Sequence, residues 1–191
     1  MATTFGRALS FACILAIPAA LGAQAIADAT LTHGTLAFDA KATLGAFTGT
    51  TTTMTGQLVG ASSLAGVRGW VEAPSRTLNT NNGHRDRDMA GSLEFDKYPV
   101  LRYDLSDVMP GETRGDSVAV TLHGRFTIHG TTRDAAIPGW VWLHPSGARF
   151  RGAVPINVKD YGVGGLSKML GVLKMNPVIV VRMDVTFGDR R

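Results

Sequence analysis

Cysteine is almost absent from this chain of 191 residues. The one cysteine, Cys13, lies in an apolar N-terminal stretch, so the rest of the chain has no thiol. Disulfide frameworks, thiol catalysis and cysteine-ligated metal sites are therefore excluded beyond that stretch. A domain built from the remaining residues must be held together by burial of apolar side chains.

Signatures of catalysis and of phosphate binding are also lacking. The chain has no Gly-x-Ser-x-Gly nucleophile motif, and the glycines of Gly162–Gly165 lack the Lys-Ser/Thr continuation of a phosphate loop. His123 and His129 lie on the polar parity of one predicted strand, which indicates surface histidines. They are separated by roughly 20 Å along an extended strand, which is too far for one metal ion. We therefore expect no enzymatic activity, no metal and no cofactor.

Blocks of like charge are missing as well. The chain has 19 basic and 15 acidic residues, a net charge of +4 at pH 7, and the basic residues are scattered. A scattered excess favours solubility and argues against nucleic-acid binding. Attraction to an anionic lipid headgroup, with a transient membrane contact, is the alternative interpretation.

The first 25 residues are typical of a secretory signal peptide. Arg7 is the only charge before Asp28, Leu9–Leu21 is apolar, and Ala23-Gln24-Ala25 is a small-x-small cleavage site. Cleavage after Ala27 fits nearly as well. The apolar run is short and interrupted by proline, which disfavours a membrane anchor. We expect residues 1–25 to be removed after export and residues 26–191 to form one domain.

Most of the remaining chain alternates between apolar and polar residues, the pattern of half-buried strands. The clearest run places on one parity Val118, Val120, Leu122, Phe126 and Ile128. The last predicted strand likewise places on one face Ile179, Val181, Met183, Val185 and Phe187. About eight such strands with short turns predict an all-β fold, a closed antiparallel β-barrel with one or two short helical segments. A β-sandwich is the alternative. A barrel of this size is filled by its own side chains or holds one small ligand.

The longest connection without strand alternation runs over residues 79–98. His84, Asp86 and Asp88 would share one side of an extended segment, which suits a metal or acid–base set. The structural interpretation, which we favour, is that neighbouring arginines supply counter-charges and that Asp86 or Asp88 caps a short helix from Met89 to Phe95.

Two tryptophans make one strand apolar on both sides. Trp140 and Trp142 share the face opposite Val141 and Leu143. Either a loop covers the tryptophans, or they form the surface of a homodimer, where exposed tryptophan is enriched.

The sequence resembles the YceI-like family in the order and spacing of several segments. These are Asn82–Met89 (NGHRDRDM), Phe95, Tyr98-Pro99, Leu122–Thr132 (LHGRFTIHGTT) and Lys159–Val163 (KDYGV). The resemblance implies a lipocalin-like barrel in the bacterial periplasm whose apolar interior holds a long-chain amphiphile, typically a polyisoprenoid such as a quinone-type or polyprenyl lipid. It also implies a recurrent polar motif of Arg85, Asp86 and Asp88, which we interpret as fastening the crossover to the barrel rim.

A second irregular segment, Gly162–Pro177, contains an apolar stripe. Leu166, Met169, Leu170 and Leu173 recur at i, i+3, i+4 and i+7, which predicts one face of a short helix. This helix would either plug one end of the barrel or act as a lid, with Met169 and Leu170 touching the lipid.

Strand parity and the resemblance together predict a lipid site inside the barrel and at the lid. Its expected residues are Phe38, Leu101, Tyr103, Val120, Leu122, Phe126, Ile128, Phe150, Met169, Leu170 and Met183. Gly69, Gly124, Gly139 and Gly152 fall on the inward parity, where they bend strands or leave room for a ligand chain. The predicted function is an exported lipid-binding protein. A sealed structural or stress-related barrel, and an enzyme using the His84–Asp88 cluster, are the alternatives.

Overall fold

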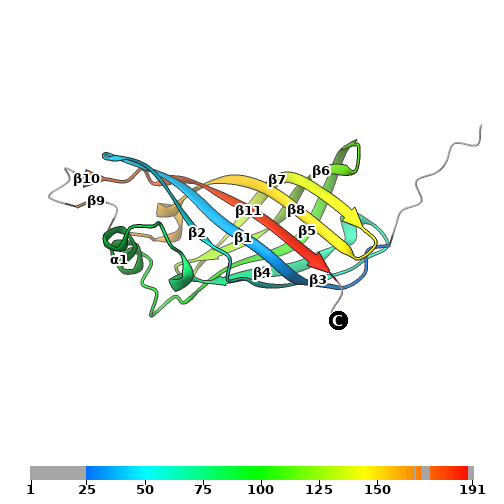
Figure 1. The fold of residues 1–191 in the computed structure, drawn as a ribbon, viewed down its shortest axis with the longest axis horizontal. Helices are drawn as coiled ribbons and strands as arrows, with labels where there is room; N and C mark the ends of the chain where they lie inside the picture. Colours follow the sequence, from blue (N-terminus) through cyan, green and yellow to red (C-terminus); the bar gives the residue numbers. More distant parts are fainter. Residues whose placement is uncertain (1–24, 166, 169–172, 189–191) are drawn as a thin grey trace, which may run out of the picture.

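The computed structural model describes residues 25–165, 167–168 and 173–188. These residues form a long β-structure with one α-helix (Figure 1). The strands are β1 (Ala29–Ala42), β2 (Gly45–Thr51), β3 (Thr55–Val59), β4 (Arg68–Pro74), β5 (Val100–Arg114), β6 (Ser117–Ile128), β7 (Thr131–His144), β8 (Gly147–Asn157), β9 (Ser167–Lys168), β10 (Leu173–Lys174) and β11 (Val178–Gly188). The helices are η1 (Leu64–Gly66), η2 (Ser75–Thr77), α1 (Gly83–Ser92) and η3 (Val158–Tyr161). None of them, within the described ranges, is both long and apolar enough to span a bilayer.

Eight antiparallel strands close into a barrel, in the order β1-β11-β8-β7-β6-β5-β4-β3 and back to β1. The closing pair is short, because β3 meets β1 only at Ala29 and Thr30. Beyond that point β2 takes the place of β3 on the same edge of β1, along Leu36–Ala42. The predicted closed antiparallel barrel of about eight strands is therefore confirmed. Closure leaves few free strand edges.

The barrel wall is completed differently at its two ends. Where β2 replaces β3, the crossover between β4 and β5 fills the wall, and β2 is joined to it through paired backbone bonds between Thr50 and Asn79. Figure 1 shows α1 and the β9–β10 hairpin together at this end, away from the C-terminal end of β11. We call it the α1 end. Side chains and loops, more than strand ladders, close the barrel there.

The interior follows the alternation of the strands. On β11 the buried residues are Ile179, Val181, Met183, Val185 and Phe187, and their neighbours in sequence face outward. On β6 the residues Val120, Leu122, Phe126 and Ile128 are buried in the same way. The inward parity predicted for these two strands is confirmed.

Inward glycines make room for aromatic rings of the protein itself. A Cβ atom on Gly139 would lie 2.6 Å from Cε2 of Phe150, and a Cβ on Gly124 would lie 2.8 Å from Cζ of Tyr103. Gly152 also faces the Phe150 ring. At these three positions the prediction that glycine leaves space for a ligand is wrong, because the rings already occupy that space.

The crossover helix begins earlier than predicted. α1 starts at Gly83, and the side-chain oxygen of Asn82 caps it by accepting from the backbone N–H groups of His84 and Arg85, both at 3.1 Å. The predicted cap at Asp86 or Asp88 and the start at Met89 are therefore wrong. Residues two apart on a helix do not face each other, so the predicted His84–Asp86–Asp88 face is not formed.

The helix predicted within Gly162–Pro177 is replaced by strand pairing at its described residues. Ser167 and Lys168 of β9 pair with Lys174 and Leu173 of β10. Backbone bonds tie this hairpin to the β1–β2 turn, with the Thr43 N–H donating to the Lys174 carbonyl at 2.9 Å. These long-range bonds outweigh a glycine-weakened helix. The remaining residues of the predicted stripe, Leu166, Met169 and Leu170, lie outside the described residues.

Candidate functional site

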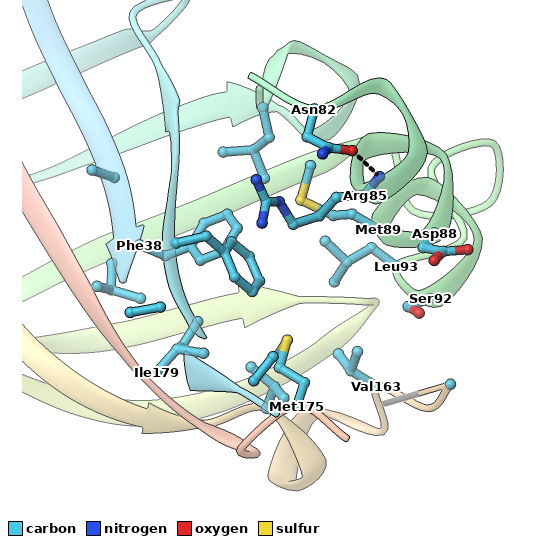
Figure 2. Close-up of a pocket in the computed structure, with 18 of the residues that line it drawn as sticks. Phe38, Asn82, Arg85, Asp88, Met89, Ser92, Leu93, Val163, Met175 and Ile179 are labelled. Carbon is cyan, nitrogen blue, oxygen red and sulfur yellow. Dashed lines mark hydrogen bonds between the residues drawn. The ribbon is translucent and has the colours of Figure 1, made fainter. Parts of the chain in front are cut away.

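The α1 end of the barrel contains a cavity of about 420 Å3, which we call the larger cavity. Its apolar wall includes Leu36, Phe38, Phe47, Met89, Leu93, Leu101, Phe126, Ile128, Val163, Met175, Ile179 and Val181. Figure 2 shows Phe38, Met89, Leu93, Met175 and Ile179 around this space. The strands contribute the wall, and one face of α1 covers it. The arrangement suits an apolar ligand that enters from the α1 end.

Two aromatic rings separate the larger cavity from a smaller one of about 60 Å3 at the other end of the barrel. Phe126 lines the larger cavity and Tyr103 lines the smaller, with their ring centroids 4.7 Å apart. The Tyr103 hydroxyl donates to the Leu122 carbonyl at 3.0 Å, which fixes the ring. Burial raises the pKa of Tyr103 well above its ordinary value, so this hydroxyl stays a donor. We call Tyr103 and Phe126 the aromatic partition.

Charged residues of α1 fasten the helix over the larger cavity. Asp86 accepts from the backbone N–H of Thr80 at 2.9 Å and from its hydroxyl at 2.6 Å. The Arg85 guanidinium donates to the Thr80 hydroxyl oxygen at 3.0 Å and to its carbonyl at 3.2 Å. The same guanidinium lies 4.3 Å from the centre of the Phe47 ring on β2. Arg85 and Asp86 therefore connect α1, the preceding loop and β2.

The rim of the cavity near α1 is polar. Arg85, Asp88 and Ser92 line the opening, and Figure 2 shows Asp88 and Ser92 together on the same helix. Nδ1 of His84 lies 2.8 Å from a guanidinium nitrogen of Arg87. Within the described part of the chain, no three His, Asp or Glu side chains gather as a metal site would require. The rim is therefore the polar part of a largely apolar cavity lining.

A polar cleft of about 410 Å3 adjoins this rim and shares Asp88 and Ser92 with it. Nε2 of His129 lies 2.6 Å from a Glu94 carboxylate oxygen, and Nδ1 lies 3.2 Å from the Tyr161 carbonyl. The interpretation of His129 as a surface histidine is wrong, since only 12% of its side chain is exposed. No local sequence pattern signals a contact between residues 35 positions apart.

The structure divides the predicted lipid site between the two cavities. Phe38, Leu101, Phe126 and Ile128 line the larger cavity, and Tyr103, Leu122, Phe150 and Met183 line the smaller. Val120 is buried but lines neither of these two. Met169 and Leu170 lie outside the described residues. The contributions of Met89 and Leu93 were missed, because both fall within the predicted helix but no local pattern indicates that this helix lies over the barrel opening.

This chain is similar to known proteins in its family pattern and in its fold. The family model described as YceI-like domain matches residues 28–187. No curated protein matches the sequence. BcnA of Burkholderia cenocepacia has a similar structure, with a TM-score of 0.67 and 15% identity over 80% of this chain and 95% of that one.

A polyisoprenoid binding domain from Saccharophagus degradans, implicated in plant cell wall breakdown, has a TM-score of 0.69 and 17% identity, covering 86% of this chain and 99% of that one. A YceI protein of Campylobacter jejuni has a TM-score of 0.52 and 14% identity, covering 65% and 73%. At these identities the likeness to the solved structures concerns the fold.

Proposed function

Because this chain belongs to the YceI-like domain family, we propose that it binds an isoprenoid-type lipid, with a quinone-type or polyprenyl tail, and has no catalytic activity. Its similarity in fold to a polyisoprenoid binding domain supports the proposal. The observation that carries it is the larger cavity, which has a volume of about 420 Å3 and largely apolar walls. Small-molecule sites commonly have this size and composition.

The distribution of polar groups supports one orientation of the lipid. The tail occupies the larger cavity, where each Å2 of apolar surface removed from water contributes about 25 cal/mol. The headgroup stays at the rim beside Arg85, Asp88 and Ser92, since a polar group buried without partners costs free energy. The tail ends at the aromatic partition.

We also propose that residues 1–25 direct export and that the protein acts in the periplasm. The signal-peptide pattern and the lack of cysteine after Cys13 support this location. A homodimer through Trp140 and Trp142 stays a prediction. Arg114 lies 5.3 Å from the Trp140 ring centre and Arg149 lies 5.8 Å from that of Trp142, so arginine side chains shield part of both rings.

Native mass spectrometry of the protein from a periplasmic extract tests the function. We expect a bound species that organic solvent removes and whose mass corresponds to an isoprenoid lipid. A protein without a bound lipid, which after solvent extraction also fails to bind an added isoprenoid alcohol, would refute the proposal and favour the sealed barrel.

A pair of neighbouring residues on β11 tests the location of the tail. Ile179 lines the larger cavity and is 8% exposed, whereas Val178 is 46% exposed and faces outward. Ile179→Thr should weaken isoprenoid binding about ten-fold, since an unpartnered buried hydroxyl costs about 1–3 kcal/mol. Val178→Thr is the control and should bind as the wild type does. Equal binding by both variants, with thermal unfolding showing both folded, would place the tail elsewhere.

A further inference from the structure

The turn between β1 and β2 exposes a large apolar side chain at the rim of the larger cavity. Leu44 is 84% exposed, more than any other large apolar residue that the structure describes. The turn residues on either side of it, Thr43 and Gly45, line the same opening. A leucine in this position adds little to the folded core. Its contact surface faces outward, next to the entrance that a lipid must use.

Backbone bonds hold this turn in a fixed position over the opening. Lys41 pairs with Ala46 in the β1–β2 ladder, and the Asn176 N–H donates to the Lys41 carbonyl at 2.7 Å. The Lys174 N–H donates to the Thr43 hydroxyl oxygen at 3.1 Å. The turn is therefore attached on both sides, and Leu44 is presented by a scaffold instead of a free loop.

The charges beside Leu44 are positive. Lys41 and Lys174 are exposed, and neither ammonium group forms an ion pair with a described residue. No acidic residue occurs in residues 40–50 or 173–180. The nearest carboxylate along the strand, Asp39, is paired with Arg182 at 2.8 Å. An apolar tip flanked by unpaired lysines matches the boundary between anionic headgroups and acyl chains in a bilayer.

We propose that Leu44, Lys41 and Lys174 form a membrane-docking tip that seats the larger cavity against an anionic bilayer. Leu44 enters the headgroup–acyl boundary, and the two lysines contact lipid phosphates. The cavity opening then faces the membrane, so that a lipid moves between bilayer and barrel without crossing water. This role in lipid exchange rests on the proposed function, whereas the docking itself does not.

Vesicle co-sedimentation of the exported protein tests the tip. Wild-type protein should bind vesicles of phosphatidylcholine and phosphatidylglycerol more tightly than vesicles of phosphatidylcholine alone. Leu44→Ser should weaken binding to the mixed vesicles about ten-fold. Lys41→Gln and Lys174→Gln should each weaken it about five-fold and reduce the preference for phosphatidylglycerol.

Two controls separate the tip from general surface properties. Met109 is 55% exposed and follows Val108, which lines the smaller cavity, so Met109→Ser removes an exposed apolar side chain at the other end of the barrel. Arg114→Gln removes one positive charge from the same β5 strand, where 70% of the arginine side chain is exposed. Both variants should bind the mixed vesicles as the wild type does. Equal losses in Leu44→Ser and Met109→Ser, or no loss in Leu44→Ser, would overturn the docking tip.

Lipid transfer distinguishes failure of this proposal from failure of the proposed function. Transfer of a fluorescent isoprenoid alcohol from mixed vesicles to the protein should slow about ten-fold in Leu44→Ser, while retention of alcohol already bound stays unchanged. Bound isoprenoid lipid together with vesicle binding that is independent of Leu44 would refute the tip alone. Vesicle binding that depends on Leu44, in a protein that retains no isoprenoid lipid, would refute the proposed function and support the docking site.

Discussion

Replacing Phe126 by alanine should change the length of the lipid tail that the barrel accepts. Phe126 is 4% exposed, and its ring lies against Tyr103 between the two cavities. Without this ring the spaces of about 420 Å3 and 60 Å3 become continuous. A longer tail then reaches the part of the barrel that the partition closes in the wild type.

Phe126→Ala should destabilise the empty protein but strengthen its binding of long tails. Loss of a buried phenylalanine costs about 3–5 kcal/mol of unfolding free energy in the empty barrel. One further isoprene unit in the merged space contributes up to about 3 kcal/mol, at about 0.8 kcal/mol per buried CH2 group. Since 1.4 kcal/mol is a ten-fold change, long tails should gain up to about 100-fold in affinity over short ones.

The assay is the affinity of solvent-extracted protein for isoprenoid alcohols of increasing length. Wild-type affinity should rise with each unit and then level off, and Phe126→Ala should level off at a longer tail. Ile128→Ala is the matched control, since Ile128 is buried on the same strand and lines the same larger cavity, but it is not part of the aromatic partition. It should weaken binding without moving the plateau. A plateau at the same length in Phe126→Ala and wild type would refute the role of the partition.

Two further changes test how the barrel is held together. A hydrogen bond from Arg149 lowers the pKa of Asp184 from its ordinary value of 3.8, so the stabilisation is present above pH 3.8 and is lost as the pH falls through the lower folded value. Asp184→Asn should therefore flatten the loss of stability in this acid range, as urea unfolding at several pH values will show. Asp86→Asn should weaken the attachment of α1 to Thr80 by about 1–2 kcal/mol. Amide hydrogen exchange in α1 should accelerate accordingly, and unchanged exchange would contradict the role given to Asp86.

The sequence predicted the strands well because each strand has one face in the core and the other in water. This local alternation identified the inward residues of β6 and β11 and the closed antiparallel sheet. Four residues of the larger cavity, among them Phe38 and Phe126, follow from the same parity. The division into two cavities does not, because it depends on where the rings of Tyr103 and Phe126 meet across two strands.

The errors arose where contacts between distant segments outweigh local pattern. An i, i+3, i+4, i+7 stripe predicted a helix after Gly162, but at the described residues this segment pairs as β9 and β10 beside the β1–β2 turn. The space beside the inward glycines could not be predicted locally, because the Phe150 ring lies against both Gly139 and Gly152. The start of α1 could have been predicted from local sequence, because asparagine is a preferred N-cap residue and Asn82 occupies that position.

The way the barrel closes supports the proposal that lipid binding and entry occur at the α1 end. Apart from the short β3–β1 closing pair, the rest of the wall consists of continuous antiparallel ladders, such as β5–β6 and β8–β11, which separate only if many backbone hydrogen bonds break together. At the α1 end β2 has displaced β3, and the wall is completed by a helix held through Thr80 and by one short backbone pairing of Thr50 with Asn79. Few bonds need to break for this part to move, so it opens at a lower free-energy cost than the continuous ladders do. In the proposed function, the tail of a lipid that enters there reaches the aromatic partition while its headgroup stays at the polar rim, so the same end of the barrel would account for entry, orientation and tail length.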